Sequence, residues 1–231
     1  MPQRGKWAHL RKCKNGADVI DYARSIVNGK KKACKPLRAA CKRFLSDLEN
    51  PKWEFRLQDA EFVIRFIETC IAHKEGERID GTPLLGQPFI LEPWEKFIIY
   101  NLLGFFIAGT KERPFKEAFI FIPRKNGKTP FVAALALALA LLERASGSRI
   151  LIIGASLKQA TQSFSHIVFN LKRMGELENF RVLDNNAEHS LSRQFYDENE
   201  QVIGSLFIEA LAANPDRHDS LVSNVQICDE L

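Results

Sequence analysis

The sequence predicts an α/β fold: a parallel sheet flanked by helices, preceded by a helical N-terminal appendage. Two patterns support it, since helical periodicity dominates up to about residue 90 and short apolar runs alternate with helical segments after Glu117. The 231 residues are 45% apolar and 26% charged, which is typical of a globular protein with a sizeable core. This composition excludes disordered, collagen-like and coiled-coil classes.

Residues 1–90 form the predicted appendage. We expect helices at residues 17–28, 36–48 and 58–73, the last because its apolar residues recur at the i, i+3, i+4 spacing of an amphipathic helix. A glycine- and proline-rich loop follows, and Pro93 then opens a helix that continues to about Phe106, as proline often does at a first helical position. This loop marks the junction with the main domain, residues 91–231.

The main domain is expected to contain a parallel sheet covered by helices on both faces. Its predicted strands are short apolar runs, and a β-hairpin excursion is expected between Phe180 and Ala213. The expected strands are Ala118–Ile122, Ile150–Ile153 and Val225–Cys228, and the expected helices are a long apolar one that ends at Glu143 and one at about Lys158–Met174.

Charge is distributed unevenly along the chain. The net charge is +5, but residues 1–50 alone carry 13 Lys and Arg against 4 Asp and Glu, or +9, which leaves −4 for the rest. Such an asymmetry favours a polyanion or an acidic protein surface as partner, with solvated helix faces as the alternative. The five cysteines include no C-x-x-C pair, so we expect reduced, structural thiols and neither a disulfide framework nor a zinc site.

No targeting or membrane segment is predicted. The basic N-terminus lacks the apolar stretch of a secretory signal, and the longest apolar run, Phe131–Leu142, is too short to span a bilayer. We therefore expect a cytosolic protein without a membrane partner.

The segment Phe119–Thr129 has the pattern of a phosphate-binding loop, or P-loop: an apolar run, a short loop and a helix start. Backbone N–H groups at a helix N-terminus suit phosphate, because they lack intrahelical partners and the helix dipole adds positive potential. Gly127 lets the main chain approach the ligand. Lys128 would neutralise the β- and γ-phosphates of ATP, and the Thr129 hydroxyl would bind Mg²⁺. The first glycine of the usual G-x-x-x-x-G-K-[ST] pattern is replaced by Ile122.

A second motif, which is acidic, follows about a hundred residues after the P-loop. There the apolar run Val225–Cys228 ends in two carboxylates. In a P-loop ATPase such a strand, Walker B, lies beside the P-loop strand. Asp229 would then reach the Mg²⁺ shell, and Glu230 would orient and deprotonate the attacking water. The two motifs together predict a site that hydrolyses ATP. A chance Gly-Lys-Thr with a solvated Asp-Glu at a chain end is the alternative.

The sequence Pro-Arg-Lys-Asn-Gly-Lys-Thr at residues 123–129 closely resembles the deviant Walker A motif of tailed-phage large terminases, of the HK97-like type. The segments at residues 152–160 and 211–218 are also similar to this family. The resemblance implies an ASCE-type P-loop fold with ATP and Mg²⁺ as ligands. Arg124, Lys125, Asn126, Gly127, Lys128 and Thr129 would surround the phosphates.

The segment Leu91–Phe97 resembles the adenine-site motif of the same family, usually Leu-x-Pro-Trp-Gln. The resemblance places Trp94 and Glu95 against the adenine. Glu95 replaces the usual glutamine, and an ionised carboxylate accepts hydrogen bonds but does not donate them. Direct reading of the adenine edge by Glu95 is therefore in question.

Two arginines are further candidates by resemblance. Arg124, within the phosphate loop, would sense phosphate or act as a lever, with a solvated side chain as the alternative. Arg217 lies shortly before Walker B, where some packaging motors insert an arginine into a neighbouring subunit's ATP site to stabilise charge on the γ-phosphate. A surface arginine on a polar loop is the alternative for Arg217.

The family continues beyond Walker B, whereas this sequence stops at Leu231. We expect the C-terminal part of the ATPase fold and the nuclease domain to be absent, and the Walker B strand to expose an unpaired edge. The resemblance implies a motor that translocates double-stranded viral DNA into a procapsid in the host cytoplasm. Its partners would be the portal protein, the small terminase subunit and further copies in a ring.

Two other functions remain open. A helicase-like DNA-dependent ATPase shares the P-loop and the Asp-Glu strand, but it would normally have a fuller glycine motif and Ala or His after the glutamate, where this chain has Leu231. A truncated fragment without ATPase activity would act only as a binding module for DNA, the small subunit or the portal.

Overall fold

The computed structural model describes residues 9–78, 80–123, 125–186, 188–213 and 222–229. They form two compact units, and each unit draws on two separate segments. The first unit comprises Met1–Arg65 and Ile90–Phe121, and the second comprises Phe66–Phe89 and Ile122–Leu231. This grouping differs from the predicted division at residue 90, because the loop before residue 90 joins the sheet-containing unit and the segment after it joins the helical unit.

The first unit is mainly helical, and its helices lie where the sequence predicts them. A short antiparallel pair of strands, with Trp53 opposite Ile107, joins the helices. The elements are the 3-10 helix η1 (Leu10–Lys12), the helices α1 (Lys14–Val27), α2 (Lys35–Glu49), the first part of α3 (Gln58–Cys70) and α4 (Pro93–Gly104), and the strands β1 (Trp53–Phe55) and β2 (Phe105–Ile107).

Aromatic rings form the core of this unit. Phe44 of α2 contacts Phe105 edge-on with ring centroids 5.7 Å apart, and Phe55 contacts Phe105 at 4.9 Å. Such edge-to-face pairs add to the free energy gained from burial. Gly104 lies directly beneath the Phe55 ring, where a Cβ atom would be only 2.2 Å from the ring, so the close packing requires glycine at this position.

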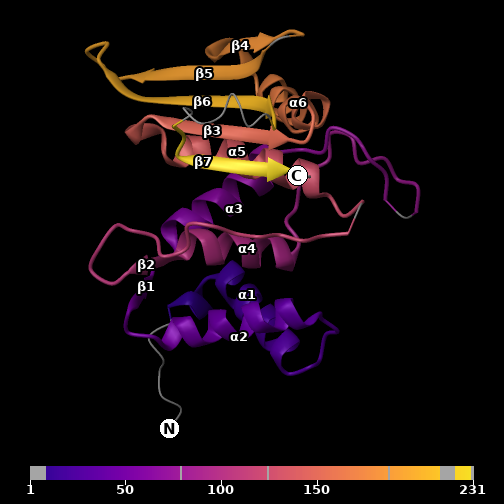
Figure 1. The fold of residues 1–231 in the computed structure, drawn as a ribbon, viewed down its shortest axis with the longest axis vertical. Coiled ribbons are helices and arrows are strands. Elements are labelled where there is room, and N and C mark those ends of the chain that lie inside the picture. The colour runs from indigo at the N-terminus through magenta and orange to yellow at the C-terminus, as the bar shows by residue number, and fades with distance from the viewer. Residues whose placement is uncertain (1–8, 79, 124, 187, 214–221, 230–231) are drawn as a thin grey trace. The chain divides into compact units, whose positions relative to one another are not determined.

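The second unit is built on a five-stranded mixed sheet, with strand order β4-β5-β6-β3-β7 (Figure 1). β3 pairs in parallel with β6 and β7, and β4, β5 and β6 pair antiparallel. The predicted hairpin is confirmed, but it extends the main sheet instead of leaving it. The strands are β3 (Ser148–Gly154), β4 (Arg181–Asp184), β5 (His189–Tyr196), β6 (Val202–Ala212) and β7 (Val225–Asp229).

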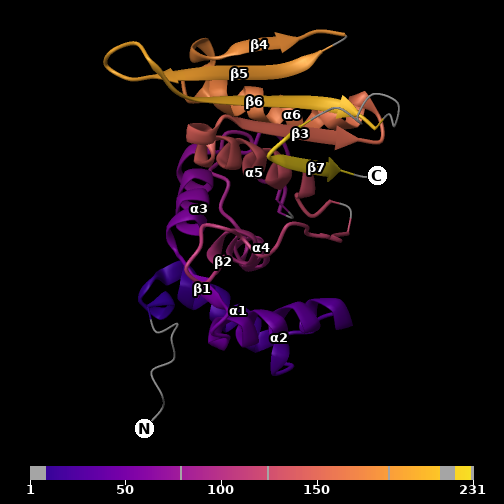
Figure 2. The same ribbon diagram turned by 60° about the vertical axis from the view of Figure 1, so that its left-hand side comes forward.

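Two helices, α5 (Lys128–Leu142) and α6 (Leu157–Arg173), pack against each other and against β3 and β6, so both cover the same face of the sheet (Figures 1 and 2). α5 is apolar on nearly all sides, which suits a helix buried between the sheet and other elements. The prediction that helices cover both faces is wrong for the described residues. Within the described chain, no helix is long and apolar enough to cross a membrane.

The prediction of a buried strand at Ala118–Ile122 is also wrong. The segment has no regular secondary structure, and the side chains of Phe119 and Phe121 are 93% and 87% exposed. A strand needs a neighbour to satisfy its backbone groups. Among the described residues β7 pairs only with β3, so β7 is an edge strand, and the apolar run at 118–122 pairs with no strand.

Candidate active site

Helix α5 begins in a tight turn that presents Lys128 as its first residue. Gly127, the residue before the helix, has φ +73° and ψ 18°, and Lys125 also has a positive φ of 65°. The left-handed conformation is rare for residues with a Cβ atom, so glycine suits position 127. Asn126 stabilises the turn, because its Nδ2 donates to the carbonyl of Pro123 at 3.1 Å. The turn therefore directs the helix N-terminus and Lys128 toward one end of the sheet.

Lys128 forms an ion pair with Asp229, the last residue of β7. The distance from Nζ to Oδ1 is 2.9 Å, and the Asp229 side chain is only 7% exposed whereas that of Lys128 is 28% exposed. The two residues that the sequence assigns to Walker A and Walker B are thus brought together. A buried carboxylate needs such a partner, because desolvation of an unpaired charge costs several kcal/mol, on the order of the stability of a whole domain.

The parallel register fixes the position of Asp229. Gly154 at the carboxyl end of β3 lies opposite Asp229 at the carboxyl end of β7. Ligand sites of open α/β sheets lie at this end of the strands. A Cβ atom at Gly154 would come within 2.8 Å of the Ala160 backbone nitrogen, so glycine allows α6 to start close to the strand end. Ser156 caps α6 by accepting the Gln159 N–H at 3.3 Å.

The residues at this end of the sheet fit a magnesium ion. Oδ1 of Asp229 is buried and accepts no hydrogen bond of good geometry from the described residues, although the Lys128 ammonium is close. Thr129, the second residue of α5, is half-buried and carries a hydroxyl. Mg²⁺ prefers oxygen ligands and is commonly held by one or two protein oxygens together with phosphates and waters. The chemistry of both side chains is therefore appropriate for this ion.

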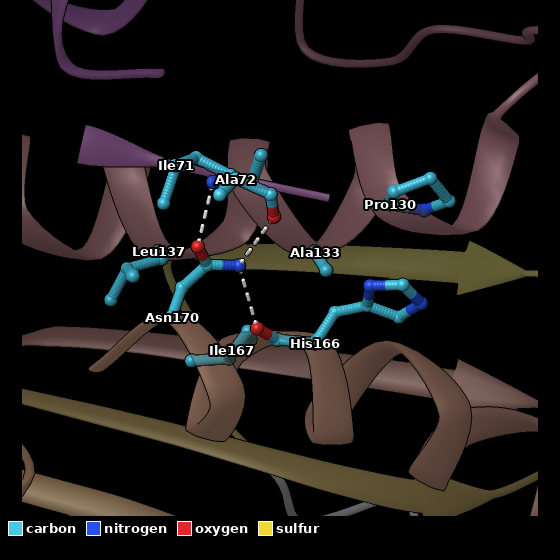
Figure 3. Close-up of a pocket in the computed structure, with 9 residues that line it drawn as sticks. Ile71, Ala72, Pro130, Ala133, Leu137, His166, Ile167 and Asn170 are labelled. Carbon is cyan, nitrogen blue, oxygen red and sulfur yellow. Dashed lines mark hydrogen bonds between the residues drawn. The ribbon is translucent and has the colours of Figure 1, made fainter. Parts of the chain in front are cut away.

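A buried polar contact holds the segment after α3 against the two helices that flank the site. Asn170 of α6 is 3% exposed, and its Oδ1 accepts the Ala72 N–H at 2.8 Å while its Nδ2 donates to the Ala72 carbonyl at 3.2 Å and to the His166 carbonyl at 2.9 Å. Figure 3 shows these bonds beside Pro130 and Ala133 of α5. All polar groups of the Asn170 amide are used, so the contact is specific to asparagine.

A void of about 10 Å³ lies at this contact, lined by residues of α5, α6 and the segment after α3 (Figure 3). It has room for roughly one water molecule. His166, which lines it, is 7% exposed, and burial lowers the pKa of its imidazole, with the nearby Lys74 adding to the effect. The imidazole is therefore neutral near pH 7. Asn170 and His166 were not among the residues predicted from the sequence, although polar residues at the apolar positions of a helix such as α6 indicate a buried polar contact.

Trp94 and Glu95, the residues of the adenine motif, lie in the first turn of α4 in the other unit. Trp94 is half-buried, whereas Glu95 is 3% exposed and its Oε2 accepts the Glu92 N–H at 2.7 Å, as in a helix capping box. Burial raises the pKa of Glu95 to about 7. A protonated glutamic acid both donates and accepts hydrogen bonds, as glutamine does. The objection that an ionised carboxylate cannot donate therefore applies above about pH 7, whereas below that pH the protonated form of Glu95 dominates.

Three predicted site residues, Arg124, Arg217 and Glu230, lie outside the described residues. Lys125 and Asn126 belong to the turn before α5, and both are exposed.

Comparisons with known proteins point to one family. The model of the family described as terminase large subunit, ATPase domain, matches residues 93–231. The crystal structure of the HK97 bacteriophage large terminase is similar, with a TM-score of 0.51 and 25% identity over 77% of this chain and 31% of that one. The large terminase ATPase domain of Thermus phage P74-26 gives a TM-score of 0.39 and 20% identity over 46% of this chain and 44% of that one. No curated protein sequence matches.

Proposed function

Because the chain belongs to the terminase large-subunit ATPase family, we propose that it binds and hydrolyses ATP as part of a phage DNA-packaging motor, and that it uses this hydrolysis to translocate double-stranded DNA. The contact between Lys128 and Asp229 is the observation that carries this proposal. It joins the two charges that ATP hydrolysis requires, a cation for the phosphates and a carboxylate for the metal, at the carboxyl end of a parallel sheet.

The ion pair has a direct role in this proposal. Without nucleotide, the Lys128 ammonium neutralises Asp229. With the triphosphate bound, Lys128 would turn to the β- and γ-phosphates, and Asp229 with the Thr129 hydroxyl would hold Mg²⁺. The ion held by these two side chains would supply positive charge against the negative charge that develops on the phosphates. The exchange of partners keeps the buried carboxylate paired in both states, which avoids the cost of an unpaired buried charge.

The remaining site residues take the roles that the sequence motifs suggest. The main chain from Lys125 to Gly127 surrounds the phosphates, and Trp94 and Glu95 contact the adenine. Glu230 positions and deprotonates the attacking water. Arg124 responds to the γ-phosphate, and Arg217 acts on the ATP site of a neighbouring subunit.

The partners of the motor are part of the proposal. We propose duplex viral DNA, the portal protein, the small terminase subunit and further copies of the chain, at the procapsid in the host cytoplasm. The chain spans 31% of the HK97 large terminase and 44% of the P74-26 ATPase domain, so these assignments concern the whole motor protein.

Phosphate release by the purified chain, with and without duplex DNA, tests the proposed function. We expect Mg²⁺-dependent turnover that DNA stimulates and that Glu230→Gln abolishes while ATP binding persists. ATP binding without turnover in the parent would favour the binding module. Strand separation coupled to turnover would favour the helicase-like ATPase.

A further inference from the structure

The first unit carries a basic surface that the ATP site does not use. Residues 22–46 contain eight Lys and Arg and no Asp or Glu. Seven of these eight side chains are exposed and lie in the α1–α2 connection or on α2. Arg43 forms an ion pair with Asp47 at 3.6 Å. We call the other six the basic corner: Lys30, Lys31, Lys32, Lys35, Arg38 and Lys42.

The helical spacing gathers this charge on one side of α2. Lys35, Arg38 and Lys42 are three and four residues apart and therefore share a helix face. The opposite face supplies the buried Cys41, Phe44 and Leu48. Lys30–Lys32 directly precede α2 in the connection from α1, and α1 and α2 lie side by side in Figures 1 and 2. The six residues thus follow one another from the α1–α2 connection onto one exposed face of α2.

Positive charge in the first turn of α2 lowers the stability of the isolated fold. The first turn of α2 contains no acidic residue and begins with Lys35, although the positive end of the helix dipole favours Asp and Glu there. Each misplaced charge costs about 0.3 to 1 kcal/mol. Within the described part of the chain, none of the six side chains forms an ion pair with a carboxylate. Positions that break a local rule without a structural gain are often functional, so an anion outside the chain is the expected partner.

The side chains around the basic corner distinguish between two anionic partners, an acidic protein surface and a nucleic-acid backbone. Protein interfaces are depleted of lysine and rely on buried aromatic or aliphatic anchors. The large hydrophobic side chains that are exposed in the described residues all lie outside residues 9–50. Contact with a nucleic-acid backbone needs only positive charge. The chemistry of the basic corner therefore fits phosphate.

We propose that the basic corner binds the sugar-phosphate backbone of duplex DNA without sequence preference. This inference builds on the proposed function and assigns a surface of this chain to the DNA that the motor moves. From Lys35 to Lys42 the helix rises about 10 Å, a length that corresponds to about three phosphates of one DNA strand along the duplex axis. The three lysines before α2 extend the contact.

The test is DNA binding by the full chain, measured by fluorescence anisotropy with a labelled 30-base-pair duplex over a range of salt concentrations. The variant Lys35→Gln/Arg38→Gln/Lys42→Gln should bind at least about tenfold more weakly at 0.1 M salt, and its log–log salt slope should fall by up to about 3, because each lost phosphate contact removes about 0.9. Glutamine is a good helix former, so α2 should persist. Two duplexes of unrelated sequence should bind the parent within about twofold of each other.

The matched control is Lys52→Gln/Lys111→Gln/Lys116→Gln, which removes the same charge from exposed positions of the same unit outside the basic corner. It should keep nearly the parent affinity. An equal loss in both variants would show that net charge alone matters and would overturn the proposal, as would an unchanged slope in the first variant. A parent that binds no duplex at low salt would also overturn it and would favour an acidic protein as partner. Since anisotropy requires no nucleotide, an inactive ATPase would contradict the proposed function alone.

Discussion

The ammonium of Lys128, at the start of α5, lies 2.9 Å from the carboxylate of Asp229, at the end of β7. Each residue comes from a motif that is weak evidence on its own, and the parallel pairing of β3 with β7 sets the position of the second. The pair is both a structural contact and the central element of the proposed ATP site, so its two roles can be separated by experiment.

The structural role predicts energetic coupling between the two residues in the absence of nucleotide. In a double-mutant cycle of Lys128→Met and Asp229→Asn, urea unfolding should give a coupling free energy of about 1 kcal/mol or more, because Asp229 is buried and its partner only partly exposed. Additive effects, within about 0.3 kcal/mol, would show that the contact contributes nothing to stability.

Asn170 predicts a second effect on stability. Asn170→Leu leaves the N–H and carbonyl of Ala72 without their partner, so the free energy of unfolding should fall by about 1 to 3 kcal/mol. The same substitution at the exposed Asn179 is the control. Asn179→Leu should change the free energy of unfolding by no more than about 0.5 kcal/mol. Equal effects of both substitutions would argue against the Asn170 contact.

Glu95 predicts a specific dependence of stability on pH. Burial raises its pKa from 4.5 in the unfolded chain to about 7 in the folded one. As the pH rises from 5 to 7 the unfolded chain releases this proton first, so the folded state loses about 2 kcal/mol of relative stability. Glu95→Gln keeps an acceptor for the Glu92 N–H and removes the titration. Its stability should therefore exceed that of the parent increasingly between pH 5 and 7.

Urea unfolding at pH 5, 6, 7 and 8 measures this effect, with the exposed Glu178→Gln as control. Parallel pH profiles for the parent and Glu95→Gln would mean that Glu95 titrates normally in the folded protein.

Most of the elements were predictable from the sequence, because local signals specify them. The amphipathic periodicity of residues 58–73 and the proline at position 93 located α3 and α4 to within a few residues. The two motifs predicted that Lys128 and Asp229 belong to one site, and their ion pair was found only in the structure. Where the sequence pattern lay within one helix, the prediction of that helix succeeded.

The failures concern long-range pairing. The apolar run at 118–122 has the composition of a buried strand, but a strand also needs a neighbour, and no local pattern specifies one. Similarly, the excursion at 180–213 was predicted as a hairpin, yet its third strand, β6, lies between β5 and β3 in the main sheet. The buried role of Glu95 as a helix cap also escaped prediction, since the family motif suggested only a ligand contact.

The central claim, that Lys128 and Asp229 are the two halves of one Mg-ATP site, is tested most directly by binding of a fluorescent ATP analogue with and without Mg²⁺. The parent should bind at least about tenfold more tightly with Mg²⁺, a difference of about 1.4 kcal/mol. Asp229→Asn should lose this gain, and Lys128→Ala should bind weakly in both conditions, whereas the exposed control Lys172→Ala should match the parent. An Asp229→Asn variant with the full Mg²⁺ gain, or a Lys128→Ala variant with parental affinity, would contradict the claim.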